Sequence, residues 1–185
     1  MARVLVPLAP GCEELEAVTL IDLLRRAGVE VTVAGLQSGP VLAARGTKLL
    51  PDVTLDEALR NHYDMIALPG GVGANHLQKD LRVVDLVRKM AEQGKFVAAI
   101  CAAPKVLAKA GILEGRRATW FPNSLSQAET RGVTHSKDPV VQDGNVITSR
   151  GPGTAMDFTL HLIGLLTNEE TRSQVEKGLE RTAGR

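Results

Sequence analysis

Cys101 is the residue of this chain best placed to act as a nucleophile. It follows an apolar run, Phe96–Ile100, that predicts a buried strand, and it precedes Ala102-Ala103-Pro104 and an Ala- and Leu-rich stretch typical of a helix. A reactive side chain at such a tight turn is exposed above the sheet, as in a nucleophile elbow. The positive end of the following helix would lower the pKa of the thiol. The alternative is an inert core cysteine beside an apolar strand.

Glu16 is an acid on an apolar helix face. A helix is predicted over Glu13–Ala27, and at about 100° per residue Glu16 falls among Leu20, Leu23 and Ala27. An ionised carboxylate is costly to bury, so we expect a raised pKa or a hydrogen-bond partner. The alternative is a first-turn acid that accepts from the free N–H groups of the helix start.

Two adjacent glycines, Gly70 and Gly71, follow the apolar strand predicted over Asp64–Leu68. Paired glycines let the backbone turn sharply and present N–H groups to a ligand, which favours stabilisation of an oxyanion. The alternative is a plain turn. A dinucleotide-binding fingerprint would need a further glycine at His76, so binding of NAD or FAD is not expected.

These groups would meet if the first predicted strand, Arg3–Leu8, and the strand Phe96–Ile100 are neighbours in one sheet. Glu16 and Cys101 would then share a crevice beside the glycine pair. An ionised Glu16 would raise the pKa of the thiol, whereas a protonated Glu16 would donate a hydrogen bond and lower it. We therefore expect a neutral acid facing a thiolate in the working state.

The elements that position these residues alternate along the chain. The predicted strands are Arg3–Leu8, Glu30–Gly35, Asp64–Leu68, Phe96–Ile100 and Asn145–Thr148, and the predicted helices are Glu13–Ala27, Asp56–Arg60, Leu81–Gln93, Ala102–Ala110, Gly153–Leu166 and Glu169–Glu180. Apolar strands separated by helices predict a mostly parallel sheet covered on both faces, a three-layer α/β sandwich. Ligands of such sheets bind beyond the carboxyl ends of the strands.

Length and composition exclude several classes of protein. The 185 residues suit a single domain, 1–185, and 44% hydrophobic with 23% charged residues argues against extended disorder. A net charge of +1 and 3% aromatic residues argue against dedicated nucleic-acid binding. No apolar run is long enough to predict a membrane span, so we expect a cytoplasmic protein. The two cysteines and four histidines lack zinc-ligand spacing, and no metal site is expected.

Several segments together resemble the ThiJ/PfpI superfamily, and within it the parkinsonism-associated protein deglycase branch with its bacterial YajL-like members. They are G-C-E-E-L-E (Gly11–Glu16), R-R-A-G-V-E-V-T-V-A-G (Arg25–Gly35), L-P-G-G (Leu68–Gly71), A-A-I-C-A-A-P (Ala98–Pro104) and T-S-R-G-P-G-T (Thr148–Thr154). The resemblance implies a flavodoxin-like sandwich that is usually a homodimer. It also implies that Cys101 is the reactive cysteine and Glu16 its protonated partner, and that the N–H groups of Gly71 and Ala102 face the developing oxyanion.

The resemblance further implies an activity without a cofactor. This is the hydrolysis of early methylglyoxal or glyoxal adducts on amines and thiols, of proteins and of nucleotides, with release of a hydroxy acid. Two alternatives use the same thiol: a redox-responsive stress protein or chaperone that senses peroxide through Cys101, and a glutathione-independent glyoxalase that converts methylglyoxal to lactate. In the protease-like branch a histidine follows the nucleophilic cysteine. Ala102 stands there in this chain, so proteolysis lacks its usual base. The roles of Cys12 and His135 stay open.

Overall fold

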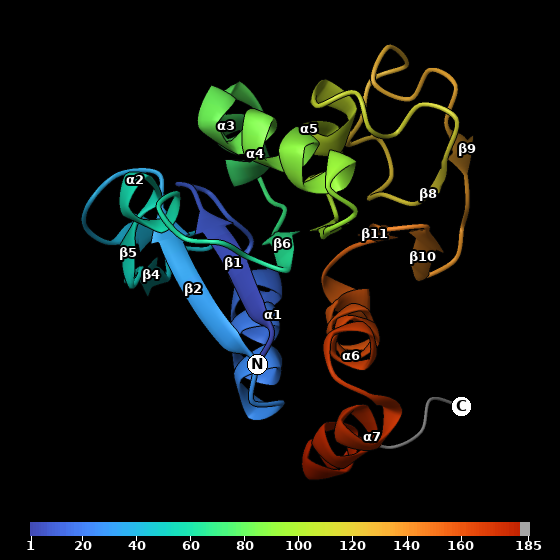
Figure 1. The fold of residues 1–185 in the computed structure, drawn as a ribbon. Coiled ribbons are helices and arrows are strands. Elements are labelled where there is room, and N and C mark those ends of the chain that lie inside the picture. Colours follow the sequence, from blue (N-terminus) through green and yellow to red (C-terminus); the bar gives the residue numbers. More distant parts are fainter. Residues whose placement is uncertain (182–185) are drawn as a thin grey trace.

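A central seven-stranded sheet organises the fold (Figure 1). The structure, a computed structural model, describes residues 1–181; positions 182–185 of the predicted domain lie outside the described residues. The strand order is β10-β11-β7-β6-β1-β2-β5, and every pair is parallel except β10 with β11. The sheet strands are β1 (Arg3–Leu8), β2 (Glu30–Gly35), β5 (Val53–Thr54), β6 (Met65–Leu68), β7 (Phe96–Ile100), β10 (Val140–Asp143) and β11 (Val146–Ser149).

Helices cover both faces of this sheet, as the sequence predicts. The helices are α1 (Glu14–Arg26), α2 (Leu55–Ala58), α3 (Gly73–Lys79), α4 (Leu81–Glu92), α5 (Pro104–Lys109), α6 (Ala155–Leu166) and α7 (Glu169–Gly178), with a 3-10 turn, η1 (Pro152–Thr154), before α6. Figure 1 shows α1 and α6 on one side of the sheet and α3, α4 and α5 grouped on the other. The flavodoxin-like three-layer sandwich is therefore confirmed.

Alternating side chains of β1 pack into two hydrophobic cores, one on each face of the sheet. Val4, Val6 and Leu8 pack into the core under α1 and α6, whereas Leu5 contributes to the core under α2 to α5. Successive side chains of a strand point to opposite faces, so a strand covered on both faces must be apolar throughout. This explains why the predicted strands read as uninterrupted apolar runs.

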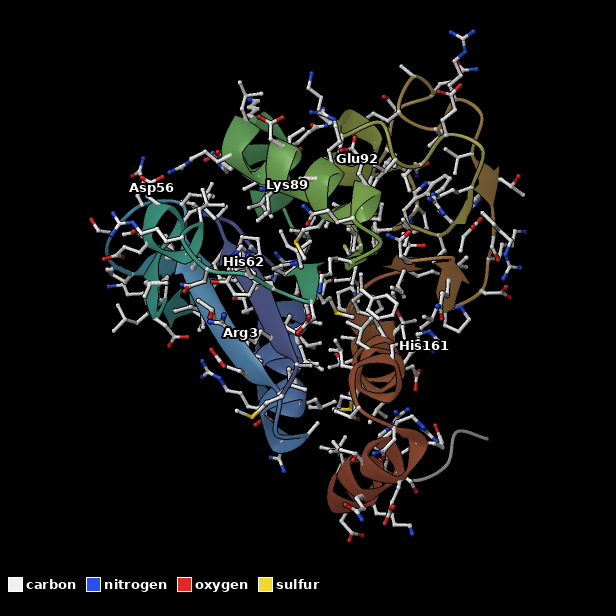
Figure 2. All side chains as sticks on the ribbon, viewed as in Figure 1. Arg3, Asp56, His62, Lys89, Glu92 and His161 are labelled. Carbon is white, nitrogen blue, oxygen red and sulfur yellow. The ribbon has the colours of Figure 1, made fainter. Side chains whose placement is uncertain are left out.

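Charged side chains lie mainly on the outer faces of the covering helices (Figure 2). Lys89 and Glu92 project from α4 into solvent, and Asp56 does so from α2. Among the described residues, no helix is both long and apolar enough to cross a membrane. Nor do three or more His, Cys, Asp or Glu side chains gather in residues 1–181 in a way that could hold a metal ion.

Several predicted boundaries need correction. The helix after Cys101 begins at Pro104 rather than Ala102, because residues 101–103 form a turn. The segment predicted as one helix from Gly153 divides into η1 and α6. The remaining predicted ends match the structure or differ from it by one or two residues. Helix α3 was not predicted, nor were the short pairs β3 (Val41–Leu42) with β4 (Lys48–Leu49) and β8 (Arg117–Ala118) with β9 (Thr134–His135), nor the sheet strands β5 and β10.

The first strand and the Phe96–Ile100 strand are not direct neighbours, so the condition considered for the meeting of Glu16 and Cys101 is not met. Strand β6 lies between β1 and β7 and pairs with both, with Val4 opposite Met65 and Ala67 opposite Ala98. The turn after β6 carries the glycine pair, so these glycines occupy the middle position at the carboxyl edge of the sheet.

Candidate active site

Cys101 stands at the turn between β7 and α5 in a backbone conformation that L-residues rarely adopt. Its φ is 65°, in the left-handed region. Two backbone hydrogen bonds hold it there: its N–H donates to the Ser149 carbonyl at 2.9 Å, and its carbonyl accepts from the Phe121 N–H at 2.9 Å. Such conformations persist only where the surroundings fix them, and they gather at functional sites. The tight turn expected from the sequence is therefore present, but the Cys101 side chain is buried, with 7% of the residue exposed, rather than exposed above the sheet.

Glu16 points inward from the first turn of α1 and is completely buried. Its Oε2 accepts a hydrogen bond from the Gly70 N–H at 2.8 Å, whereas its Oε1 has no hydrogen-bond partner among the described residues. The helix start is capped by another acid, because the Glu13 carboxylate accepts from the Glu16 N–H at 2.8 Å. The first-turn role considered for Glu16 thus belongs to Glu13, and Glu16 remains available to the crevice.

Gly70 brings the acid and the thiol together. A Cβ atom placed on Gly70 would lie 2.7 Å from the Cβ of Cys101, 2.9 Å from the Ala102 nitrogen and 2.9 Å from Glu16 Oε2. These contacts are shorter than real Cβ atoms allow, so only glycine fits where the three segments converge. Glu16 and Cys101 do share a crevice beside the glycine pair, although β6 separates their strands.

Burial dominates the electrostatics of the pair. Burial raises the pKa of Glu16 to about 7, against the opposing effects of the Gly70 N–H and the Cys101 thiol. The pKa of Cys101 is raised to about 12, first by burial and second by the negative charge of Glu16. The lowered thiol pKa expected from the sequence is therefore not found while Glu16 is ionised. Two buried groups this close hold one negative charge between them, so a thiolate requires that Glu16 keep its proton.

Two backbone amides counteract the effect of burial on the thiol. The N–H groups of Gly71 and Ala102 oppose the rise in the pKa of Cys101. Gly71 has φ +76°, and a Cβ there would lie 2.5 Å from the Gly11 carbonyl oxygen. The sharp turn predicted at the glycine pair is thus required by close backbone approach. Gly71 and Ala102 therefore influence the charge of the thiol through their N–H groups, whereas the Gly70 N–H donates to Glu16.

Cys12 and His135 lie apart from this chemistry. Cys12 bridges to Gly71 through its backbone, but its side chain is buried and burial raises its thiol pKa to about 11. His135 stacks on Trp120 with 4.2 Å between ring centroids. The structure therefore gives both residues packing contacts.

Sequence reasoning missed the partners that hold Cys101. Ser149 and Phe121 reach it through backbone atoms, which leave no signature in residue type. The signal that was present is the T-S-R-G-P-G-T segment, because Ser149 ends β11 beside β7 and the segment continues into η1 and α6. This segment holds the Cys101 turn through the Ser149 carbonyl.

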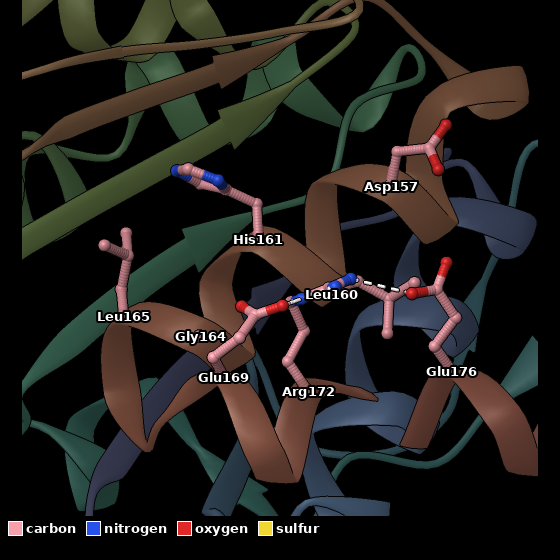
Figure 3. A pocket seen from close by; sticks show the side chains of 8 residues that line it. All are labelled: Asp157, Leu160, His161, Gly164, Leu165, Glu169, Arg172 and Glu176. Atoms are coloured by element: carbon pink, nitrogen blue, oxygen red, sulfur yellow. Dashed lines mark hydrogen bonds and ion pairs between the residues drawn. The ribbon is translucent and has the colours of Figure 1, made fainter. Parts of the chain in front are cut away.

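A separate cavity of about 540 Å³ lies between α6 and α7 (Figure 3). Arg172 bridges Glu169 and Glu176 across it, and His161 points into the same space. No residue of the Glu16 and Cys101 crevice lines it. These ion pairs lie within α7 and play no part in the site at the carboxyl edge of the sheet.

Known proteins with the same architecture cover nearly the whole chain. The chain is 44% identical to the protein dj-1beta of Drosophila melanogaster over 95% of both chains. It is 34% identical to a Caenorhabditis elegans protein named glutathione-independent glyoxalase DJR-1.2, over 96% of this chain and 95% of that one. The crystal structure of Drosophila melanogaster DJ-1beta superposes with a TM-score of 0.93 at 43% identity, covering 98% and 99% of the two chains.

A solved structure described as Toxoplasma gondii DJ-1, oxidized, superposes with a TM-score of 0.91 at 34% identity, covering 99% of this chain and all of that one. The sequence pattern of the DJ-1/PfpI family matches residues 2–165, which include every residue of the site. The resemblance read from the five segments is thus confirmed, and the closer affiliation with bacterial YajL-like members stays a prediction. The chain belongs to the DJ-1/PfpI family.

Proposed function

We propose that this protein is a cofactor-independent, Cys101-dependent hydrolase of early methylglyoxal and glyoxal adducts on amines and thiols. The observation that carries the proposal is the convergence of the Cys101 thiol, the buried acid Glu16 and directed N–H groups at Gly70. Attack on the former carbonyl carbon of such an adduct needs three parts: a nucleophile, a group that carries the proton, and N–H donors that stabilise the oxyanion.

The first step exchanges the modified group for Cys101. The thiolate forms a bond to the adduct carbon and the original thiol or amine leaves, taking the proton of Glu16. The enzyme then carries a hemithioacetal, in which the former aldehyde carbon bears a hydroxyl group and the sulfur of Cys101. The N–H groups of Gly71 and Ala102, which oppose the rise in the pKa of Cys101, stabilise negative charge developing on the neighbouring oxygen.

The second step moves two hydrogens within the bound molecule. Glu16 removes the proton from the carbon attached to sulfur and returns a proton to the adjacent carbon, while the hydroxyl proton of the first carbon passes to the oxygen of the second. The first carbon is thereby oxidised to a thioester and the second is reduced to an alcohol. Water then cleaves the thioester and releases lactate from methylglyoxal, or glycolate from glyoxal. Electrons balance without an external oxidant. An acid with a pKa of about 7 is suited to accept and return a proton near neutral pH.

A second candidate function is the glyoxalase reaction. It is favoured by the relative named glutathione-independent glyoxalase, which is 34% identical to this chain. Free methylglyoxal would add directly to Cys101 and enter the same sequence at the hemithioacetal. The ratio of kcat/KM for free aldehyde to kcat/KM for a preformed adduct ranks the two reactions.

The deciding experiment compares Cys101→Ala with Cys12→Ala, which removes the other thiol of the chain. We expect Cys101→Ala to lose release of lactate from methylglyoxal-modified cysteine and lysine, and Cys12→Ala to retain it. Full release by Cys101→Ala would overturn the proposal. Selective peroxide uptake at Cys101 with no hydroxy acid from any adduct would instead identify a redox-responsive protein.

A further inference from the structure

A cavity of about 350 Å³ adjoins the Cys101 turn and takes no part in the chemistry described above. Phe121 forms part of its lining and donates its N–H to the Cys101 carbonyl. Arg150 lines it too, and directly follows Ser149, whose carbonyl accepts the Cys101 N–H. Both walls of the cavity are therefore fixed to the backbone of the reactive residue.

Two positive charges line this cavity. Neither Lys137 nor Arg150 forms an ion pair with any carboxylate in the part of the chain that the structure describes. The Arg150 Nη1 donates to the Lys137 backbone carbonyl at 3.4 Å, so Arg150 is oriented by a neutral acceptor and its charge remains uncompensated. The nearby acid Asp138 faces Arg117 at 3.3 Å.

The remaining lining is apolar and partly open. Phe121 is 46% exposed, and Pro139 and Pro152 present further apolar surface. A Cβ atom on Gly151 would lie 3.0 Å from the Phe121 ring, so Gly151 lets the ring lie close to this wall. An apolar floor beside two free cations suits a small ligand with a carbon body and an anionic end.

We infer that this cavity, with Lys137 and Arg150 as specificity-determining residues, binds the carboxylate or phosphate of an anionic adduct whose modified carbon reaches Cys101. The inference rests on the proposed function for the reaction at Cys101. Binding of an anion in this cavity does not depend on that function. The Arg150 guanidinium is suited to pair with two oxygens of a carboxylate or phosphate, and Lys137 adds a point charge. Adducts without an anionic group would lose these contacts.

The first test measures turnover of matched adducts that differ in charge. Methylglyoxal adducts of N-acetylcysteine and of its amide report on a carboxylate, and adducts of guanosine monophosphate and of guanosine report on a phosphate. For each pair we expect Arg150→Gln and Lys137→Gln to lower the anionic-to-neutral ratio of kcat/KM by about fivefold, which corresponds to about 1 kcal/mol. Arg150→Lys should retain more of the ratio than Arg150→Gln.

Lys89→Gln is the matched control, because it removes the same charge from the outer face of α4 (Figure 2). Its ratio should equal that of the wild type. A fall only for the N-acetylcysteine pair assigns the site to carboxylates, and a fall only for the nucleotide pair assigns it to phosphates. Equal ratios in wild type, Arg150→Gln and Lys137→Gln for both pairs would overturn the inference.

The second test needs no turnover. The rates at which iodoacetate, an anion, and neutral iodoacetamide alkylate Cys101 are compared in a Cys12→Ala background. Arg150→Gln should lower the ratio of the iodoacetate rate to the iodoacetamide rate, and Lys89→Gln should not. If no adduct yields hydroxy acid but this ratio falls, the proposed function fails and the anion site stands. If adducts are hydrolysed but Arg150→Gln changes neither the anionic-to-neutral ratio of kcat/KM nor the ratio of the two alkylation rates, the anion site fails and the function stands.

Discussion

At the residue scale, the defining feature is one negative charge held between Glu16 and Cys101. Burial raises both pKa values, and the Glu16 charge adds to the rise at the thiol. A proton on Glu16 removes that repulsion and frees the thiolate form. A neutral Glu16 facing a thiolate, the state expected from the sequence, has the same net charge as an ionised Glu16 facing a thiol. The reaction with substrate needs the state with the thiolate.

The pH dependence of stability should report the buried acid. The folded pKa of Glu16, about 7, lies above its ordinary value of 4.5, so the unfolded state loses this proton first as pH rises. The group therefore lowers the free energy of unfolding between pH 4.5 and 7, by on the order of 3 kcal/mol. Denaturant titrations across this range should show the fall in the wild type and a flatter profile in Glu16→Gln. Equal slopes would contradict the assigned pKa.

Glu16→Gln should also separate thiol reactivity from turnover. Without the Glu16 charge the pKa of Cys101 should fall, so iodoacetamide should alkylate it at lower pH than in the wild type. Hydroxy-acid release should nevertheless drop about 100-fold or more, because the amide cannot carry the proton. The measurements are the pH profile of alkylation and a lactate assay on the same samples. Parallel loss of both would assign Glu16 a purely structural role.

At the element scale, the turn after β6 sets the geometry of the site. Gly70→Ala would place a methyl group 2.7 Å from the Cys101 Cβ and 2.9 Å from the Ala102 nitrogen. We expect a loss of about 1–3 kcal/mol in unfolding free energy, together with loss of hydroxy-acid release. Gly178→Ala is the control, because nothing lies within 4 Å of a Cβ there at the end of α7. Retained activity in Gly70→Ala would show that the close approach is dispensable.

The spacing of apolar residues predicted the helices and strands that bury an entire apolar face. Glu16 stood out because an acid on an apolar face breaks a helical pattern, and Cys101 because small residues and a proline follow an apolar strand. The order of the strands in the sheet could not be predicted in this way, because it depends on which faces pack together rather than on any local pattern. The sequence therefore did not reveal that β6 separates β1 from β7. Two-residue strands and the seven-residue α3 were missed because they hold too few residues for a period.

The cavity lined by Lys137 and Arg150 could not be predicted from the sequence for a different reason. Lys137 and Arg150 stand in loop segments whose residues carry no periodic signal, and surface cations are common. Only the structure shows that both line one cavity and that neither has an ionic partner among residues 1–181. The hydrogen bonds that tie this cavity to Cys101 run between backbone atoms.

At the scale of the whole molecule, the expected homodimer should use the exposed apolar surface of α1. Val18 and Leu50 are 46% and 76% exposed and line one surface cavity of about 280 Å³. Exposed apolar side chains grouped in this way are typical of protein interfaces. We expect Val18→Arg to yield a monomer by light scattering coupled to size-exclusion chromatography, with Lys89→Gln unchanged. A wild-type monomer at all concentrations would contradict the expectation.

The hydrogen bond from the Cys101 N–H to the Ser149 carbonyl spans a long stretch of chain. During synthesis, Cys101 leaves the ribosome well before Ser149 does, so the growing chain carries an ordinary, unshielded thiol until β11 docks against β7. Pairing of distant parallel strands is slow compared with helix formation. Electrophiles can therefore cap this cysteine before the turn that holds it is complete.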